Sequence, residues 1–199
     1  MKLLVQTFTD PTVRSNNLRA LGIHAFLSVS GFAVFALFVM VLNGGLMGEG
    51  PEWSGLVGGL VTVAAGIPLY VYFGYYFLEN SEKKAILSVA WVFALTVLSG
   101  IIMAAGPLAA SFEHLLSLPP GSSVQEYLIL VAFPLNILGL GIAALLSNIA
   151  WPFLLRLEPL IYLLTSFAPS GFLYLGLRLK MKRNAGEKNS EVSEARVHD

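Results

Sequence analysis

The chain has 199 residues, of which 56% are hydrophobic and only 12% are charged, and its formal net charge is zero. Soluble domains carry about 25% charged residues, so this composition indicates that lipid surrounds the chain, and the charge balance excludes a strongly basic nucleic-acid-binding protein. Because the chain has no cysteine and its three histidines lie far apart in sequence, we expect no metal site, and we assign no cofactor.

Long uncharged stretches dominate the chain. Five of them are long enough, or nearly so, to cross a membrane: 20–42, 55–78, 85–108, 127–150 and 159–177. A hydrocarbon core of about 30 Å requires about 20 apolar residues in a helix. The stretches lack the alternation of barrel strands, and in lipid each backbone N–H and C=O needs a partner within its own segment. The sequence therefore predicts an all-α membrane protein, a bundle of about five hydrophobic helices.

We expect the transmembrane helical domain to occupy residues 20–179, between two more polar ends. Residues 1–19 form an N-terminal segment that contains basic residues. Residues 180–199 are polar and lack apolar periodicity, so we expect them to form a disordered tail.

The connectors differ in charge. Residues 43–54 and 109–126 contain no Lys or Arg, whereas residues 79–84 contain Lys83 and Lys84. Cytoplasmic loops of membrane proteins are enriched in Lys and Arg, so the N-terminus and residues 79–84 are expected on the cytoplasmic side. We expect a multi-pass protein of the cell membrane, of the bacterial inner-membrane type.

The last part of the chain leaves the topology open. With five spans the tail, which begins "RLKMKR" at Arg178, lies outside, and the Lys and Arg residues are divided equally between the two sides. Two alternatives avoid this tie with four spans and one re-entrant segment, either 151–177 or 127–150. Irregular backbone at membrane depth is tolerated where protein or water covers it. Five spans and four spans plus a re-entrant segment both stay open.

Small residues in the second stretch predict helix packing. Gly55 and Gly59 form a G-x-x-x-G pair, and Gly58, Thr62 and Gly66 recur at four-residue spacing. In lipid, small faces let helix backbones approach closely. We therefore predict these residues at helix–helix contacts.

An aromatic run, "YVYFGYYF" from Tyr70 to Phe77, ends the same stretch. It is typical of an interfacial belt, in which the rings are buried and the Tyr hydroxyls are wet. An aromatic cage for a cationic or sugar-like ligand is the alternative. A cage requires rings that converge, and one helix distributes them around its circumference.

His24 and Asn136 lie within apolar stretches and are candidates for a polar path or for partner contacts. His24 either bonds a neighbouring group near the headgroups or serves as a proton relay or pH sensor. Asn136 either bridges helices or contacts a substrate; bridging is the commoner role of such residues.

Arg156 and Glu158 are the other two candidates for a polar path or partner contact. They are two residues apart and do not face each other on a helix, and Pro159 disfavours helical geometry at Glu158. These features favour a connector between two membrane segments. The alternative is a charged pair that lines a water-filled cavity, because charged residues within a membrane are usually functional.

The sequence contains no nucleotide-binding or hydrolase motif that would indicate an enzyme. Residues 139–144, "GLGIAA", imitate a dinucleotide fingerprint, but they lie in an apolar stretch and follow no strand. We therefore expect a non-catalytic multi-pass protein, a subunit or accessory of a larger membrane complex, whose partners are the lipid bilayer and other membrane-protein subunits and not a nucleic acid. The alternative is a small-solute permease, and an intramembrane enzyme has the least support.

Overall fold

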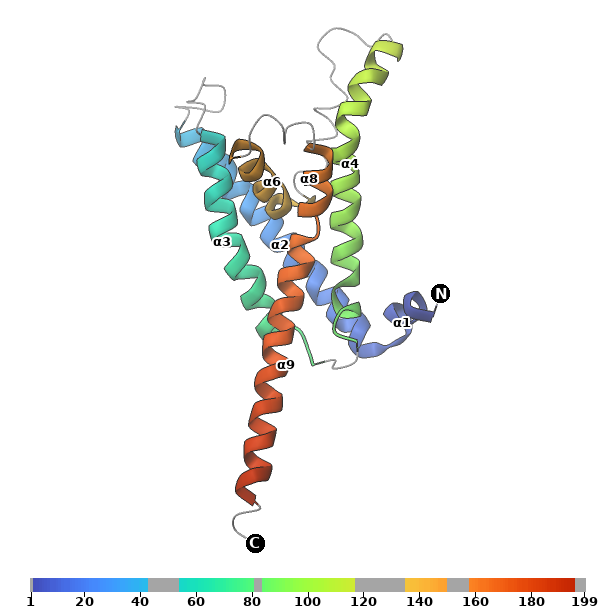
Figure 1. The fold of residues 1–199 in the computed structure, drawn as a ribbon, viewed down its shortest axis with the longest axis vertical. Helices are drawn as coiled ribbons and strands as arrows, with labels where there is room; N and C mark the ends of the chain where they lie inside the picture. The colour runs from blue at the N-terminus through green and yellow to red at the C-terminus, as the bar shows by residue number, and fades with distance from the viewer. Residues whose placement is uncertain (1, 43–53, 81–83, 117–134, 150–157, 196–199) are drawn as a thin grey trace.

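The computed structural model describes residues 2–42, 54–80, 84–116, 135–149 and 158–195 (Figure 1). Every regular element in this part of the chain is a helix, which confirms the predicted all-α fold for the described residues. In chain order the helices are α1 (Lys2–Thr9), α2 (Pro11–Leu42), α3 (Ser54–Phe77), the short 3-10 helix η1 (Leu87–Val89), α4 (Ala90–Leu116), α6 (Ile137–Ile149), α8 (Glu158–Thr165) and α9 (Ala168–Ala195).

Four helical stretches are long and apolar enough to cross a membrane, and they are compatible with a multi-pass membrane protein. They lie in α2, in α3, in η1 with α4, and in α8 with α9, as Pro11–Phe38, Val57–Phe77, Leu87–Ala105 and Pro159–Glu187. We call the end at which α2 begins and α3 finishes the basal end, and the opposite end the apical end. In Figure 1 the basal end is the lower one.

Helix α2 begins where its sequence provides a cap. The backbone N–H groups of Thr12 and Val13 donate to Asp10 Oδ1 at 3.0 and 3.1 Å, and Pro11 occupies the first helical position, where its missing N–H costs nothing. Lys84 Nζ donates to Asp10 Oδ2 at 2.6 Å. The bond from Lys84, together with the cap, holds the pKa of the Asp10 carboxyl below its usual value. One carboxylate thus starts α2 and ties it to the segment before α4.

Helix α6 is a half-span that begins inside the bundle. It packs along the apical half of α3: Leu138 lies against Gly66, and Leu145 lies against Gly59. It therefore runs antiparallel to α3 and finishes at the apical end (Figure 1). Its 13 residues span about 20 Å at 1.5 Å per residue, which is too short for a core of about 30 Å.

In its described part the chain has four helical stretches long enough to cross a membrane, and α6 is not one of them. Helix α4 finishes at the apical end and so does α6, and α8 and α9 then return to the basal end, where both termini lie (Figure 1). Of the stretch expected at 127–150, the structure describes residues 135–149, which include α6. Residues 127–134 lie outside the described part. The stretch expected at 159–177 is α8 and the beginning of α9, and Pro169 sits in the first turn of α9, where proline is tolerated.

This topology removes the tie in the distribution of basic residues. Lys180 Nζ donates to the carbonyl of Leu78 at 2.7 Å, so the basic part of α9 lies at the basal end, where α3 finishes. Every Lys and Arg in the described part belongs to α1, to the first turns of α2, to the segment before α4 or to this part of α9. One end of the bundle therefore carries all of these cations.

The C-terminal part of the chain differs from the prediction. Residues 180–199 were expected to be disordered, whereas α9 continues to Ala195. The extension carries an i,i+4 pair, in which Arg183 Nε donates to Glu187 Oε1 at 2.8 Å, and such pairs support an exposed helix. Polarity alone therefore misleads here, because a helix already formed in the bundle can extend into water through residues of good helix propensity.

The closest helix crossing is that of α3 with α9. A Cβ on Gly74 would overlap the carbonyl oxygen of Leu173, and a Cβ on Gly176 would overlap the carbonyl oxygen of Val71. Neither backbone can move aside, since both are hydrogen-bonded helices. The crossing thus depends on two glycines that lie outside the predicted packing set.

We expect Gly176→Ala to lower the free energy of unfolding by about 1–3 kcal/mol, the typical cost of overpacking. Gly22→Ala is the matched control, because a Cβ on Gly22 meets nothing within 4 Å and the change gains roughly 0.5–1 kcal/mol of helix propensity. Unfolding in mild detergent, followed by circular dichroism, measures both variants. If the Gly176→Ala protein were as stable as the wild type, the close contact between α3 and α9 at this glycine would be contradicted.

Candidate functional site

His24 is a buried ionisable side chain inside the spans that joins three helices. Its Nδ1 lies 2.7 Å from the hydroxyl of Tyr70 on α3, and its Nε2 lies 2.8 Å from the carbonyl oxygen of Leu135, just before α6. His24 and Tyr70 are each only 1% exposed. We call these three residues the His24 cluster.

The partners determine which ring nitrogen carries the proton. A carbonyl oxygen can only accept, so Nε2 of His24 donates to Leu135; in the neutral ring, Nδ1 then accepts from the Tyr70 hydroxyl. The result is a directed chain from Tyr70 through His24 to Leu135. It gives the Leu135 carbonyl a partner inside the bundle, where an unpaired carbonyl would be costly.

Asn136 caps the N-terminus of α6. Its Oδ1 accepts from the backbone N–H of Gly139 at 3.1 Å, and its carbonyl accepts the first helical bond from Leu140 at 3.0 Å. This is the geometry of an N-cap residue. Asn136 is 2% exposed, so the structure brings His24 and Asn136 together at the beginning of one half-helix.

The other two predicted polar residues lie elsewhere. Arg156 falls outside the described residues, and Glu158 is the first residue of α8. Helix α8 begins at the apical end (Figure 1), whereas the His24 cluster is inside the bundle. The structure therefore does not join Glu158 to His24 and Asn136.

The predicted small residues of α3 face two different helices. A Cβ on Gly58 would meet Phe35 of α2, and one on Gly59 would lie 3.4 Å from the carbonyl oxygen of Gly141 in α6. Thr62 is 3.3 Å from a Cβ placed on Gly141, and Gly66 faces Leu138. Gly55 lies in the first turn of α3. Gly74 and Gly176 escaped prediction because neither belongs to a repeated small-residue pattern.

The aromatic run from Tyr70 to Phe77 does not converge on one point. Tyr70 turns into the bundle, whereas Tyr72 and Tyr76 are exposed and lie 4.5 Å apart between ring centroids. The Tyr75 hydroxyl accepts from Arg183 Nη1 at 3.0 Å at the basal end. Rings distributed in this way do not form a cage.

Sequence analysis also missed two buried asparagines that close the basal end. Asn16 Nδ2 donates to the carbonyl of Glu79 at 2.9 Å, and Asn16 Oδ1 accepts from the N–H of Glu79 at 2.8 Å. Asn17 Nδ2 donates to the carbonyl of Leu87 at 2.7 Å, and its Oδ1 accepts from the N–H of Trp91 at 3.0 Å. Both side chains are fully buried. In the sequence, these contacts are indicated only by an Asn-Asn pair shortly before the apolar stretch 20–42.

Many of the described polar groups inside the spans bond within the fold, whereas the buried Ser28 hydroxyl and the Trp91 indole N–H have no hydrogen-bond partner in the described part of the chain. The hydroxyls of Thr165 and Ser166 donate to carbonyls of α8 at 2.9 and 2.6 Å. Among the described residues, no group of three His, Asp or Glu side chains could hold a metal ion. Comparison of the chain with protein-family models, curated proteins and solved structures gives no match in any of the three.

We expect His24→Phe to cost about 1–3 kcal/mol of unfolding free energy, because it leaves the buried Leu135 carbonyl without a donor. Tyr70→Phe should cost less in the His24→Phe background than in the wild type, because the bond that it removes is already absent. His24→Gln keeps a donor and is the conservative control. A double-mutant cycle of unfolding in detergent measures the coupling, and additive costs would contradict the directed chain.

Proposed function

We propose that this chain is a non-catalytic, multi-pass protein of the cell membrane that acts as a subunit or accessory of a larger membrane complex. The observation that carries the proposal is the outward face of α2. Only 17% of the most apolar window of Pro11–Phe38 is buried within the chain, against 44% for Pro159–Glu187. The first span is thus the least covered of the four.

Small residues lie on this outward face. Gly22, Ala25, Val29 and Ala33 are all exposed, and they fall on one side of the helix. A Cβ on Gly22 would meet nothing within 4 Å. Faces of this kind let a second helix approach closely in lipid, where packing replaces the hydrophobic effect. We call these four residues the α2 face and propose that a transmembrane helix of a partner covers it.

Support for a non-catalytic role comes from the polar side chains. His24 bonds Tyr70 and Leu135, and Asn136 caps α6. These interactions account for both residues as parts of the fold. The basal end carries the described Lys and Arg residues, which supports a cytoplasmic position for both termini, because cytoplasmic ends of membrane proteins are enriched in these residues.

A small-solute permease is the second candidate, and one observation favours it. Helix α6 is a half-span that begins at the His24 cluster inside the bundle, and α8 and α9 are two parts of one span with a break between Thr165 and Ala168. Transporters commonly build substrate sites from discontinuous helices near the bilayer midplane. Alanine at Arg156 and Glu158 should then abolish an uptake phenotype at unchanged protein level, and unaltered uptake would remove this candidate.

A photo-crosslinking residue at position 29 should capture a partner polypeptide in native membranes, and one at position 94, exposed on α4, should not. Ala25→Phe with Ala33→Phe should lower the yield at position 29 by roughly five- to 150-fold, because overpacking of about 1–3 kcal/mol corresponds to that range. Ala64→Phe with Ala94→Phe, at two other exposed alanines, is the matched control.

Two results from the same membranes, one of them after solubilisation in mild detergent, would contradict the proposal. A monodisperse monomer with no crosslink at position 29 would overturn the proposal of a complex. A crosslink of equal yield in the Ala25→Phe, Ala33→Phe variant would show that the α2 face is not the contact.

A further inference from the structure

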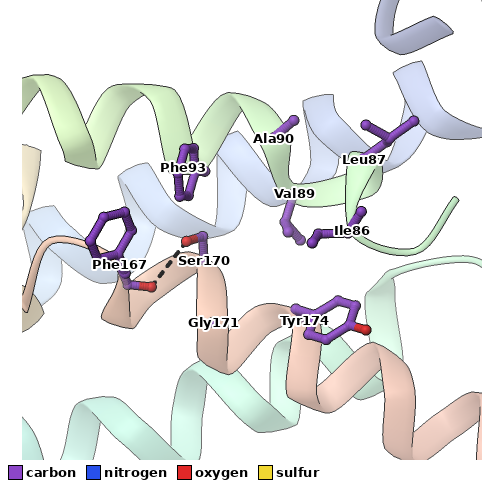
Figure 2. Close-up of a pocket in the computed structure, with 9 residues that line it drawn as sticks. All are labelled: Ile86, Leu87, Val89, Ala90, Phe93, Phe167, Ser170, Gly171 and Tyr174. Atoms are coloured by element: carbon purple, nitrogen blue, oxygen red, sulfur yellow. Dashed lines mark hydrogen bonds between the residues drawn. The ribbon is translucent and has the colours of Figure 1, made fainter. Parts of the chain in front are cut away.

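A hollow of about 390 Å³ opens between the beginning of α4 and the beginning of α9, away from the His24 cluster and the α2 face. It is lined by Ile86, Leu87, Val89, Ala90, Phe93, Phe167, Ser170, Gly171 and Tyr174. Figure 2 shows Ile86, Val89 and Phe93 pointing from one side toward Phe167, Ser170 and Tyr174 on the other. We call this hollow the α4–α9 slot.

The lining of the slot is apolar. None of its residues is charged, and Ser170 turns its hydroxyl to the carbonyl of Phe167 at 3.0 Å, within its own helix (Figure 2). Gly171 leaves space in the slot, since a Cβ on this residue would meet nothing within 4 Å. A volume of this size lies within the range of small-ligand cavities. The slot therefore suits a hydrocarbon chain rather than a polar solute.

Cations continue from the slot along the same face of α9. Tyr174, Arg178 and Lys182 follow one another at four-residue spacing, and the Arg178 guanidinium lies 6.0 Å from the Tyr174 ring centroid. Arg178 and Lys182 also line a second hollow of about 520 Å³ with Leu179, Met181 and Ala185. The apolar slot thus leads directly to a site with two cations.

These two cations differ from three other basic side chains of the basal end, which form ion pairs. Arg19 pairs with Glu79, Lys84 with Asp10, and Arg183 with Glu187. Within the described part of the chain, no acidic side chain forms an ion pair with Arg178 or Lys182, and both are exposed. Their charge is therefore available to an anion from outside the protein.

The two parts follow one another along α9 toward the basal end. The slot extends from Ile86, just before α4, to the exposed Phe167, just before α9. Arg178 and Lys182 lie beyond it on the basal side, where Lys180 bonds the carbonyl at the end of α3. An occupant must accordingly be apolar inside the leaflet and anionic at its surface.

We propose that the α4–α9 slot and the cations Arg178 and Lys182 form a binding site for an anionic phospholipid of the basal leaflet. An acyl chain fills the slot, and the phosphate lies against the guanidinium and ammonium groups, which form charge-assisted hydrogen bonds with phosphate oxygens. Basic pockets at the cytoplasmic ends of membrane helices bind anionic lipid headgroups for the same reason. The inference does not depend on the proposed partner of α2.

The test measures lipid retention on the full-length, delipidated protein by native mass spectrometry after incubation with phosphatidylglycerol or phosphatidylcholine. The wild type should retain phosphatidylglycerol in preference. Arg178→Gln with Lys182→Gln should lower that retention roughly ten- to thirtyfold, from about a kilocalorie per cation, and leave phosphatidylcholine unchanged. Arg14→Gln with Arg183→Gln removes the same charge from the same end and should have little effect.

A second pair of variants tests the slot. Gly171→Phe fills it and should reduce retention of both lipids, whereas Ala64→Phe places the same side chain at an exposed position of α3 outside the slot and should not. Equal phosphatidylglycerol retention by the wild type and the Arg178, Lys182 variant would overturn the proposal. Thermal stabilisation by glycerol phosphate as large as that by phosphatidylglycerol would also overturn it, because the site would then bind a free anion. If Gly171→Phe fails to fold, the exposed cation variants still decide the result.

Discussion

The bundle depends on one requirement of the lipid environment, that every backbone carbonyl inside it has a donor. Helix α6 begins within the bundle, so the carbonyl of the partly buried Leu135 lies just before the first regular bond of that helix. His24 donates to this carbonyl at 2.8 Å and is itself held by Tyr70. A histidine suits this role because one ring nitrogen donates while the other accepts, so that three helices are joined by one neutral side chain.

The half-span that this interaction supports determines the topology. Since α6 is too short to cross, the described part has four candidate spans, and both termini lie at the basal end (Figure 1). The basic residues then gather at that end, where Asn16 and Asn17 close the turn between α3 and α4 through the backbone of Glu79 and Leu87. Polar groups therefore serve two purposes, support of irregular backbone inside the bundle and closure of its basal surface.

The sequence was sufficient for the helical class and the apolar stretches, because lipid imposes a strong and local pattern on composition. It left the number of spans open, since an uncharged stretch does not reveal whether its backbone crosses or returns. The Gly74–Gly176 crossing needs two distant helices to meet, and Asn16 finds its partners more than sixty positions away. The tail was wrongly expected to be disordered, because its helix extends one that the bundle has already formed.

The central claim is that residues 135–149 insert without crossing, and the absence of cysteine makes this directly measurable. Single cysteines at Thr9, Asn43 and Asn184 can be labelled with a membrane-impermeant maleimide in intact cells and in inverted vesicles. The account predicts that Thr9→Cys and Asn184→Cys react from one side and Asn43→Cys from the other. Reaction of Asn184→Cys from the same side as Asn43→Cys would mean an odd number of spans and would contradict the half-inserted helix.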